Sequence, residues 1–488
     1  MSPPEKSKVS FKNVPQNILL VTFDALRADF LGCYGHQKDV SPNIDDFASE
    51  GVLFKNSFAN GPNTFSSMPS LLTSTYPLMY GGYDTLSKKR VLLSEVLAQE
   101  DFKTAGFHCN PYLSSMFGYN RGFIDFKWRF TKRGDSFSSL IQNKVLNLFS
   151  SNQKVPLLRF FEQRYSGLRR RVGRLTEKIY GQLGIKHIPK YARAEKLTDT
   201  AISWLEKLQK SDKFFLWIHY LDPHAPYNPP PQYLRKLGYP SFSQEEIATL
   251  YHKHLGNDIH EEEYYQLKAL YQGEIRYMDH EVGRLLQYLE KRKLKNNTLM
   301  VFTADHGEEF GEHGGLGHKA KLYDELLHIP LILYYKDLEN SIVDLPVELL
   351  DIAPTICDSL NIRQPPAFQG ESFLPSLIGE ETSHEKLIIS EVTPDKIFNS
   401  TNVGKSISLR LQNWKYIYHE QKPDELYNLK RDPFEENNVI ADAKELTQIL
   451  QKKILRHRLK EERSSKRALK TKIKRIKKHF KSHPLSEA

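Results

Sequence analysis

Cysteine is scarce in this chain, and long apolar runs are missing. The sequence has only Cys33, Cys109 and Cys357, an odd and widely spaced set that provides neither a disulfide framework nor a zinc motif with closely spaced ligands. No apolar stretch approaches the roughly 18 residues needed to span a bilayer. No apolar segment follows the first charged residues, as it would in a secretory signal. These absences predict a cytoplasmic protein.

The positive charge of the chain is concentrated in two segments. The net charge is +10, but residues 127–194 hold sixteen Lys or Arg against three acids, and residues 452–481 hold fifteen against two. The rest of the chain is therefore acidic. This uneven distribution predicts that the two basic segments have an anionic surface or polymer as their partner.

One stretch of the acidic body joins an apolar run to side chains that can do chemistry. Residues 298–304 are mostly apolar or β-branched and predict a buried parallel strand, and Asp305, His306 and Gly307 follow directly. Ligands of open α/β sheets bind beyond the carboxyl ends of such strands. A polar loop ending in a glycine turn has the same local sequence, so other strands must supply compatible side chains.

Two earlier segments supply such side chains. Residues 17–23 form a second apolar run, and the acid after it, Asp24, could join the same site or cap the next helix. Thr64 lies at or just before the start of a predicted helix, where the helix dipole favours an alkoxide and an anionic substrate. Thr64, Ser66 and Ser67 are equally eligible as the N-cap of that helix.

Together these segments resemble a sulfatase-type member of the alkaline phosphatase superfamily. The matching pieces lie in the family's order from residue 17 to about residue 439, interrupted by one large insertion. The resemblance implies an α/β fold with a mostly parallel central sheet, helices on both faces and a small antiparallel C-terminal sheet. The matching pieces are residues 21–29, 41–45, 71–77, 220–227, 303–314, 319–330 and 425–433.

The nucleophile that the resemblance implies is Thr64. Sulfatases of this family use a formylglycine made from the first residue of a Cys/Ser-x-Pro-x-Arg motif. The formylglycine position lies seven residues before the first leucine of a Leu-Leu-Thr element, and that leucine is Leu71 here. Thr64 occupies that position, while Ser66 replaces the motif proline and Met68 the arginine. The chain is thus similar to threonine-nucleophile members such as phosphodiesterases and phosphoglycerol transferases, whose threonine oxygen both ligates the metal and attacks.

The resemblance also implies one divalent metal ion, held by Asp24, Thr64, Asp305 and His306. The second aspartate that the family usually has after the first strand is Ala25 here. A shell with fewer carboxylates and one imidazole favours manganese or zinc, while calcium and magnesium stay compatible with it.

Further residues are implied around the substrate. His224 follows a third apolar strand, residues 214–220, and would bind the sulfuryl or phosphoryl oxygens; the alternative is a loop histidine bonded to backbone. Lys319 stands where the family has an anion-binding lysine, and His318 would be the leaving-group acid or a further ligand. His313 fits a structural loop residue equally well.

The expected organisation has three parts. Residues 1–390 form the catalytic domain with the basic insertion at about 127–194, residues 391–440 form the small antiparallel subdomain, and residues 441–488 form a basic tail, either an exposed helix or a disordered arm. Within the insertion, residues 168–180 have the pattern of a basic amphipathic helix, which could lie on a membrane or cover the active site. No base-reading module accompanies the charge, so no specific nucleic-acid binding is expected.

The sequence therefore predicts a metal-dependent hydrolase of sulfate or phosphate esters, in which Thr64 attacks in line and forms a covalent intermediate. Phosphate esters are the better expected substrates, because a threonine sulfate lacks the route by which a formylglycine hydrate expels sulfate. Two other functions stay open: transfer of a phosphorylated headgroup between lipid or glycan acceptors, and non-catalytic binding by a retained fold. The expected partners are an anionic ester, lipid- or glycan-linked for a transferase, and an anionic membrane contacted peripherally by the basic segments.

Overall fold

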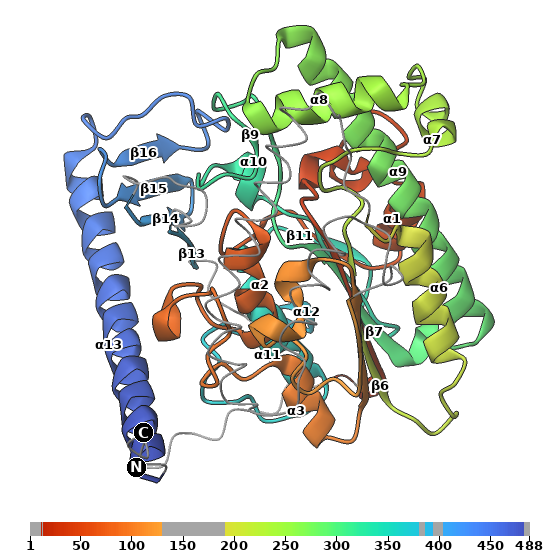
Figure 1. Cartoon of the computed structure of the whole chain (residues 1–488), viewed down its shortest axis with the longest axis horizontal. Helices are drawn as coiled ribbons and strands as arrows, with labels where there is room; N and C mark the ends of the chain where they lie inside the picture. Colours follow the sequence, from red (N-terminus) through yellow and green to blue (C-terminus); the bar gives the residue numbers. More distant parts are fainter. Residues whose placement is uncertain (1–10, 12, 129–190, 380–385, 394–403, 483–488) are drawn as a thin grey trace, which may run out of the picture.

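The structure is a computed structural model that describes residues 11, 13–128, 191–379, 386–393 and 404–482 (Figure 1). From residue 465 to residue 482 it describes the backbone but not the side chains. Most of the basic insertion predicted at residues 127–194, including the amphipathic helix at residues 168–180, lies outside the described residues. Within the described ranges, no helix is long and apolar enough to cross a membrane.

An eight-stranded sheet forms the centre of the molecule. Its three longest strands, β1 (Asn17–Phe23), β6 (Phe214–Tyr220) and β7 (Thr298–Ala304), are buried along their whole length, as expected for strands covered on both faces. The strand order is β11-β2-β10-β7-β1-β6-β4-β5, where the other strands are β2 (Val52–Phe54), β4 (Lys103–His108), β5 (Asp125–Lys127), β10 (Leu331–Tyr334) and β11 (Ser341–Val343).

Most neighbouring strands of this sheet are parallel. β1 is parallel to both β6 and β7, and β4 is parallel to β6 and β5. β10 is antiparallel to β7 and to β2, and β2 is parallel to β11. The predicted mostly parallel sheet is confirmed, and β10 is a central strand that runs in the opposite direction to β7.

Helices cover both faces of this sheet (Figure 1). α9 buries Ile275, Met278, Val282, Leu285 and Leu289, which recur at the spacing of one helix face. The predicted helices on both faces are thereby confirmed. On one side lie α1 (Pro42–Ser49), α6 (Ala194–Leu205) and α9 (Glu261–Lys291), and on the other α2 (Thr64–Thr73), α3 (Leu93–Gln99), α11 (Ile352–Ser359) and α12 (Leu374–Leu377).

Shorter elements surround the strand ends. The hairpin of β8 (Glu309–Phe310) and β9 (Leu316–Gly317) follows β7 almost directly, so the residues between Asp305 and His318 belong to one ordered segment. The remaining elements are α7 (Pro231–Lys236), α8 (Gln244–Gly256), α10 (Asp324–Leu327) and the pair β3 (Ser57–Phe58) and β12 (Val347–Glu348).

A separate four-stranded antiparallel sheet follows, in the order β13 (Leu387–Val392), β14 (Ser406–Leu411), β15 (Trp414–His419) and β16 (Glu425–Asn428). Its first strand begins a few residues before the predicted domain boundary at residue 391. The small antiparallel C-terminal sheet is confirmed. It has its own core, formed by Ile389, Ile407, Leu409, Tyr416, Leu426, Leu450 and Ile454.

The last helix, α13 (Lys444–Ser482), runs along this small sheet (Figure 1). Leu450 and Ile454 are buried in the core of the small sheet, and His457 Nε2 lies 2.6 Å from Glu391 Oε1. The prediction for the basic tail was an exposed helix or a disordered arm. Its start is a helix, and one face of that helix is docked on the small sheet. A narrow apolar stripe was enough to attach it, although the sequence lacks the broad apolar face of an ordinary surface helix.

Candidate metal centre and catalytic site

The ends of two adjacent parallel strands bring the predicted acids together. β1 and β7 are paired with Phe23 opposite Ala304, so Asp24 and Asp305 follow at the same edge of the sheet. Ligand atoms of Asp24, Asp305 and His306 lie within 4.8 Å of one another, and all three residues are buried. His306 Nε2 lies 3.5 Å from Asp24 Oδ1 and 3.6 Å from Asp305 Oδ2. These three residues form the centre of the candidate site.

Thr64 completes this centre from the first turn of α2. Its Oγ1 lies 3.3 Å from His306 Nε2 and 3.5 Å from Asp24 Oδ1. The N-cap of α2 is Asn63, whose side chain accepts the backbone N–H of Ser66. The helix thus needs no cap from Thr64, and the positive end of its dipole lies at the Thr64 hydroxyl.

The neighbouring hydroxyls do not compete with Thr64 for the site. Ser66 Oγ and Ser67 Oγ both donate to the backbone carbonyl of Asn63 at 3.0 Å. The uncertainty about which hydroxyl faces the acids is resolved in favour of Thr64.

Asp24 is held so that one of its two oxygens faces the cluster. Its Oδ2 accepts a hydrogen bond from Asn110 Nδ2 at 2.9 Å and lies 3.0 Å from His219 Nε2. Burial opposes ionisation of Asp24, but the positive charge of His224 and the hydrogen bonds from His219 and His306 hold its pKa well below the ordinary value. Oδ1 is left as an anionic oxygen directed at Thr64 and His306.

Asp305 has an oxygen that lacks a hydrogen-bond partner. Its Oδ1 accepts the backbone N–H groups of Ala25 at 3.2 Å and of His306 at 2.9 Å. Its Oδ2 is buried and accepts no hydrogen bond from the described residues. Burial and the Asp24 charge raise the pKa of Asp305. An unpaired carboxylate oxygen in the interior is costly, and a cation would offset that cost.

His306 presents a ring nitrogen that suits a metal ligand. Its Nδ1 lies 2.8 Å from the carbonyl oxygen of Gly307, which can only accept, so Nδ1 carries a proton and Nε2 faces the carboxylates. Burial lowers the pKa of His306, but Asp305 and Asp24 outweigh it and raise the pKa to about 9. The donor set of three oxygens and one imidazole nitrogen fits a divalent transition metal better than calcium.

A second group of side chains borders the centre. The ring centroid of His318 lies 4.5 Å from that of His306 and 4.8 Å from that of His224. His318 Nδ1 lies 3.0 Å from Glu308 Oε1, and Tyr227 donates its hydroxyl proton to Glu308 Oε2 at 2.8 Å. His224 and His318 are partly exposed, whereas Glu308 is buried. The two histidines therefore lie between the candidate metal centre and solvent, and the Glu308 carboxylate holds His318 in place.

The protonation of this second group follows from the same contacts. Burial opposes ionisation of Glu308, but His318, His254 and His224 lower its pKa to about 2. Burial lowers the pKa of His318, and the Glu308 charge opposes that shift. Glu308 is therefore an anion at neutral pH and holds the Nδ1 proton of His318, which leaves Nε2 for a substrate.

Two other predicted residues lie away from the centre. Lys319 is exposed, and its Nζ donates to Asn257 Oδ1 at 3.0 Å, so the structure does not bring it against Thr64. His313 stacks on Tyr323 with ring centroids 3.6 Å apart, and its Nδ1 lies 2.7 Å from Glu325 Oε1. His313 is a structural loop residue.

Four contributors to the site were not identified from the sequence: Asn110, His219, Tyr227 and Glu308. Asn110 follows the end of β4 and could have been found by the same strand-end argument that selected Asp24. Glu308 belongs to the Asp-His-Gly-Glu segment, and the sequence gave no reason to choose it as a site residue over the acids that follow it. His219 lies inside β6, where the sequence shows only another strand residue.

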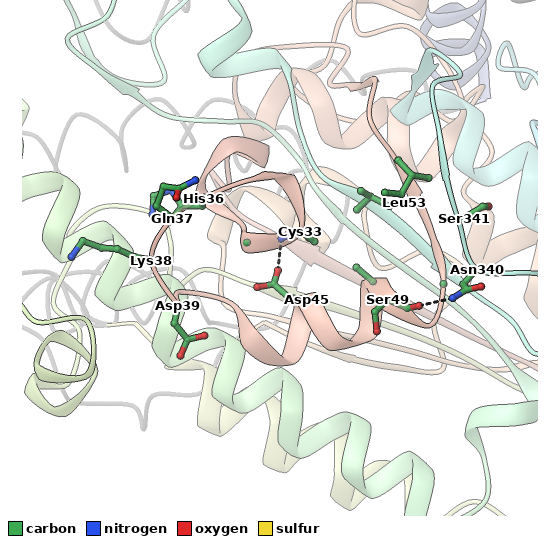
Figure 2. Close-up of a pocket in the computed structure, with 14 residues that line it drawn as sticks. Cys33, His36, Gln37, Lys38, Asp39, Asp45, Ser49, Leu53, Asn340 and Ser341 are labelled. Carbon is green, nitrogen blue, oxygen red and sulfur yellow. Dashed lines mark hydrogen bonds between the residues drawn. The ribbon is translucent and has the colours of Figure 1, made fainter.

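A separate cavity lies elsewhere. It has a volume of about 740 Å³ beside α1, between the loop that carries Cys33 and the segment that carries Asn340 (Figure 2). Cys33 N donates to Asp45 Oδ1 at 2.8 Å and Asn340 Nδ2 donates to the carbonyl of Ser49 at 3.0 Å, so these polar groups in its wall already pair with one another. The cavity shares no lining residue with the metal centre, and we assign it no part in the chemistry.

Comparison with known proteins places these observations in a family context. A family model described as Sulfatase matches residues 16–362, and one described as N-sulphoglucosamine sulphohydrolase, C-terminal, matches residues 311–465. An arylsulfatase from Clostridium perfringens is 26% identical over 463 residues, which cover 87% of this chain and 90% of the relative.

Two solved structures share the fold. The phosphonate monoester hydrolase of Agrobacterium radiobacter has a TM-score of 0.68 at 21% identity, with 92% of this chain and 96% of that chain covered. A protein solved in complex with its substrate D-glucosamine-2-N,6-O-disulfate has a TM-score of 0.69 at 21% identity, with 92% and 98% covered. The arrangement of the central sheet and the small C-terminal sheet is thus one already seen in hydrolase structures.

Proposed function

This chain belongs to the sulfatase family, and on that premise we propose that it hydrolyses sulfate or phosphate-type esters of an anionic substrate with Thr64 as the nucleophile. The observation that carries the proposal is the position of the Thr64 hydroxyl, which lies against Asp24 and His306 at the N-terminus of α2. Similarity to an arylsulfatase, to a phosphonate monoester hydrolase and to a protein bound to a disulfated glucosamine supports this substrate class, with a glycan as one carrier of the ester.

Asp24, Thr64, Asp305 and His306 would hold one divalent cation. The unpaired Oδ2 of Asp305 and the unprotonated Nε2 that His306 can present support this assignment. When bound, such a cation lowers the pKa of a ligating hydroxyl and neutralises charge on an ester oxygen. The N-terminal end of α2 adds a positive dipole at the same place, which favours both the threonine alkoxide and an anionic substrate.

His224 would bind an oxygen of the substrate, and His318 would transfer a proton to the leaving group. His318 Nε2, left unprotonated because Glu308 holds the Nδ1 proton, takes the proton of Thr64 Oγ1 directly or through water. Thr64 Oγ1 forms a bond to phosphorus or sulfur, the bond to the alcohol oxygen breaks, and His318 returns the proton to that oxygen. Water then gives a proton to His318 Nε2 as it attacks the threonine ester, and the bond between Thr64 Oγ1 and phosphorus or sulfur breaks. His318 returns that proton to Oγ1, which restores the hydroxyl and releases the phosphate or sulfate product. His224, in its protonated form, would bind a non-bridging oxygen, and Glu308 keeps His318 in one tautomer.

Thr64 favours phosphate over sulfate chemistry. A threonine sulfate is a stable ester that has no hydrate hydroxyl to expel the sulfate, so turnover on sulfate esters would stop at the covalent stage. A phosphothreonine can be attacked by water with inversion at phosphorus. We therefore propose that phosphate diesters or monoesters are cleaved faster than sulfate esters.

Hydrolysis of matched aryl esters tests this function. The purified full chain is expected to cleave an aryl phosphate monoester or diester faster than the aryl sulfate, and Thr64→Ala should reduce both rates by roughly 10⁴-fold or more, since loss of a nucleophile removes the covalent route. With the monoester as substrate, intact-mass analysis after rapid acid quenching should show phosphate added to the wild type and not to Thr64→Ala.

The neighbouring serines supply matched controls. Ser66→Ala and Ser67→Ala each remove a hydroxyl from the same helical turn, but both hydroxyls bond the Asn63 carbonyl and not the cluster, so activity should change little. Faster sulfate hydrolysis that survives the loss of Thr64 would overturn the nucleophile assignment. An acceptor alcohol added to the assay shows whether the anion is transferred to it instead of to water.

A further inference from the structure

We propose that the outward face of α13 is a docking surface for an anionic lipid membrane. This outward face is defined by six exposed residues, Ile449, Lys452, Leu455, Arg456, Leu459 and Arg463. The proposal concerns how the protein is positioned and does not depend on the hydrolase activity.

The geometry of α13 separates an inner stripe from this outward face. The inner stripe, Leu450, Ile454, His457 and Glu461, recurs at steps of four, three and four residues and is buried against the small sheet and its neighbours. The outward face recurs at the same helical spacing on the opposite side. Because the inner stripe attaches α13 to the folded body, its outward face is presented without any ordering of a disordered segment.

The outward face exposes large apolar side chains that the fold does not use. Ile449 is 52% exposed, Leu455 55% and Leu459 45%. They lie within eleven residues on one side of one helix, at steps of six and four residues. Single exposed apolar residues need no explanation, but a row of them on a charged helix marks an interaction surface.

The cations on the two sides of α13 have different partners. On the side towards the body, Arg458 of α13 donates to the hydroxyl of Tyr418 at 2.6 Å, and Glu461 of α13 pairs with Lys405 of the body at 2.8 Å. On the outward face, Lys452, Arg456 and Arg463 make no ion pair within the part of the chain that the structure describes. Their charge is therefore available to an external anion.

The combination of leucines with unpaired cations favours a lipid surface as the occupant. In an interfacial helix, apolar side chains enter the boundary between headgroups and acyl chains while lysine and arginine reach the phosphates. The sequence adds charge of the same sign further along, with nine Lys or Arg and no acid between residues 466 and 481. Nucleic acid would satisfy the cations but would leave the isoleucine and the leucines without a partner.

Vesicle binding by the full chain tests the proposal. The wild type should co-sediment with phosphatidylcholine vesicles that contain phosphatidylserine, should release them at high salt, and should not bind vesicles of phosphatidylcholine alone. The double variant Lys452→Gln/Arg456→Gln should weaken partitioning by about fivefold for each cation removed. Leu455→Ser/Leu459→Ser should weaken it by about tenfold or more, because two apolar side chains no longer enter the interface.

Matched variants on other surfaces control for net charge and for apolar content. Lys207→Gln/Lys210→Gln removes the same charge from two exposed lysines after α6, and Phe434→Ser removes an apolar side chain that is 74% exposed and does not belong to α13. Both should bind vesicles as the wild type does. All variants should keep the wild-type melting temperature and the wild-type rate on a small soluble ester, which shows that the fold is intact.

Three results would overturn the proposal. One is the absence of binding to vesicles that contain phosphatidylserine, and another is binding that the outward-face variants leave unchanged. The third is tight binding of a single-stranded RNA that depends on Lys452 and Arg456 but not on the leucines, together with weak vesicle binding. That third result would assign the outward face to nucleic acid.

Discussion

Two pairs of largely buried carboxylates differ in their charged neighbours. One pair, Asp324 and Glu435, lies near the small C-terminal sheet, and the other, Asp24 and Asp305, lies at the ends of β1 and β7. Lys415 Nζ lies 2.7 Å from Asp324 Oδ1 and 2.7 Å from Glu435 Oε1, and Arg410 also pairs with Asp324. Asp24 and Asp305 make no ion pair with a lysine or arginine among the described residues; their titratable neighbours within 4 Å are histidines.

Each pair has one carboxyl with a lowered pKa, Asp24 or Asp324, and one with a raised pKa, Asp305 or Glu435. The two pairs differ in whether lysine and arginine side chains compensate the buried charge. At Asp324, burial opposes ionisation but Arg410 and Lys415 hold the pKa far below its ordinary value. At Asp305, burial and the Asp24 charge act together and raise the pKa. Buried charges need compensation. The C-terminal cluster obtains its cations from the chain, whereas we propose that the catalytic cluster obtains its cation from solution.

The largest expected effect comes from Asp305→Asn, which removes the carboxylate with the unpaired oxygen. Bound divalent metal, measured by elemental analysis of the purified protein, should be lost, and turnover should fall by roughly 10⁴-fold or more, as it does when a nucleophile is disabled. Asp324→Asn is the matched control, because it removes a carboxylate that already has cations of its own, and its metal content should equal that of the wild type. If Asp305→Asn bound as much metal as Asp324→Asn and the wild type, the metal centre would be refuted.

The next effect is on stability and tests the other cluster. Lys415→Met leaves Asp324 and Glu435 buried without their shared cation and should lower the free energy of unfolding by about 3–5 kcal/mol. Urea denaturation followed by fluorescence measures this. Lys422→Met breaks an ion pair in which the lysine is 50% exposed, and it should change the free energy of unfolding by no more than about 1 kcal/mol. Similar losses in the two variants would show that Lys415 has no special role.

A smaller effect is expected where the chain orients a ligand of the metal centre. Asn110→Ala removes the donor that turns Asp24 Oδ1 towards the cluster and should weaken metal affinity by about 10–100-fold, measured by competition with a chelating indicator. Asn257→Ala removes an amide that holds only Lys319 and should leave the affinity unchanged. If both variants bind metal like the wild type, the hydrogen bond from Asn110 does not position Asp24.

The smallest expected effect per step is a pH dependence of metal affinity, measured for each pH unit. His306 has a pKa of about 9, above its ordinary value, when only the carboxylates surround it, so a cation must displace a proton at any lower pH. Affinity should therefore rise by about tenfold for each pH unit from neutral pH towards 9 and then level off. Titration calorimetry at several pH values would measure both the affinity and the proton released, and an affinity independent of pH would exclude His306 as a ligand.

Sequence reasoning identified the centre of the site because its members are marked locally. Asp24, Asp305 and His306 each follow an apolar strand, and parallel strands end at the same edge of a sheet, so the pattern predicts that they meet. The choice of Thr64 over Ser66 depended on a resemblance to a family. The structure supplies the physical reason, which is that Asn63 caps the helix and also accepts the hydroxyls of both serines.

The sequence alone determined the class of fold through its resemblance to a family. It also determined the strand-end acids and the uneven distribution of charge, because apolar runs and composition are properties of local segments. Tertiary structure decided that His219 reaches Asp24 from inside β6, that Glu308 supports His318, and that Lys319 turns to Asn257. It also decided that the first turns of α13 dock through a narrow stripe. These contacts join residues from separate elements, and they depend on strand register and helix placement, which no single segment encodes.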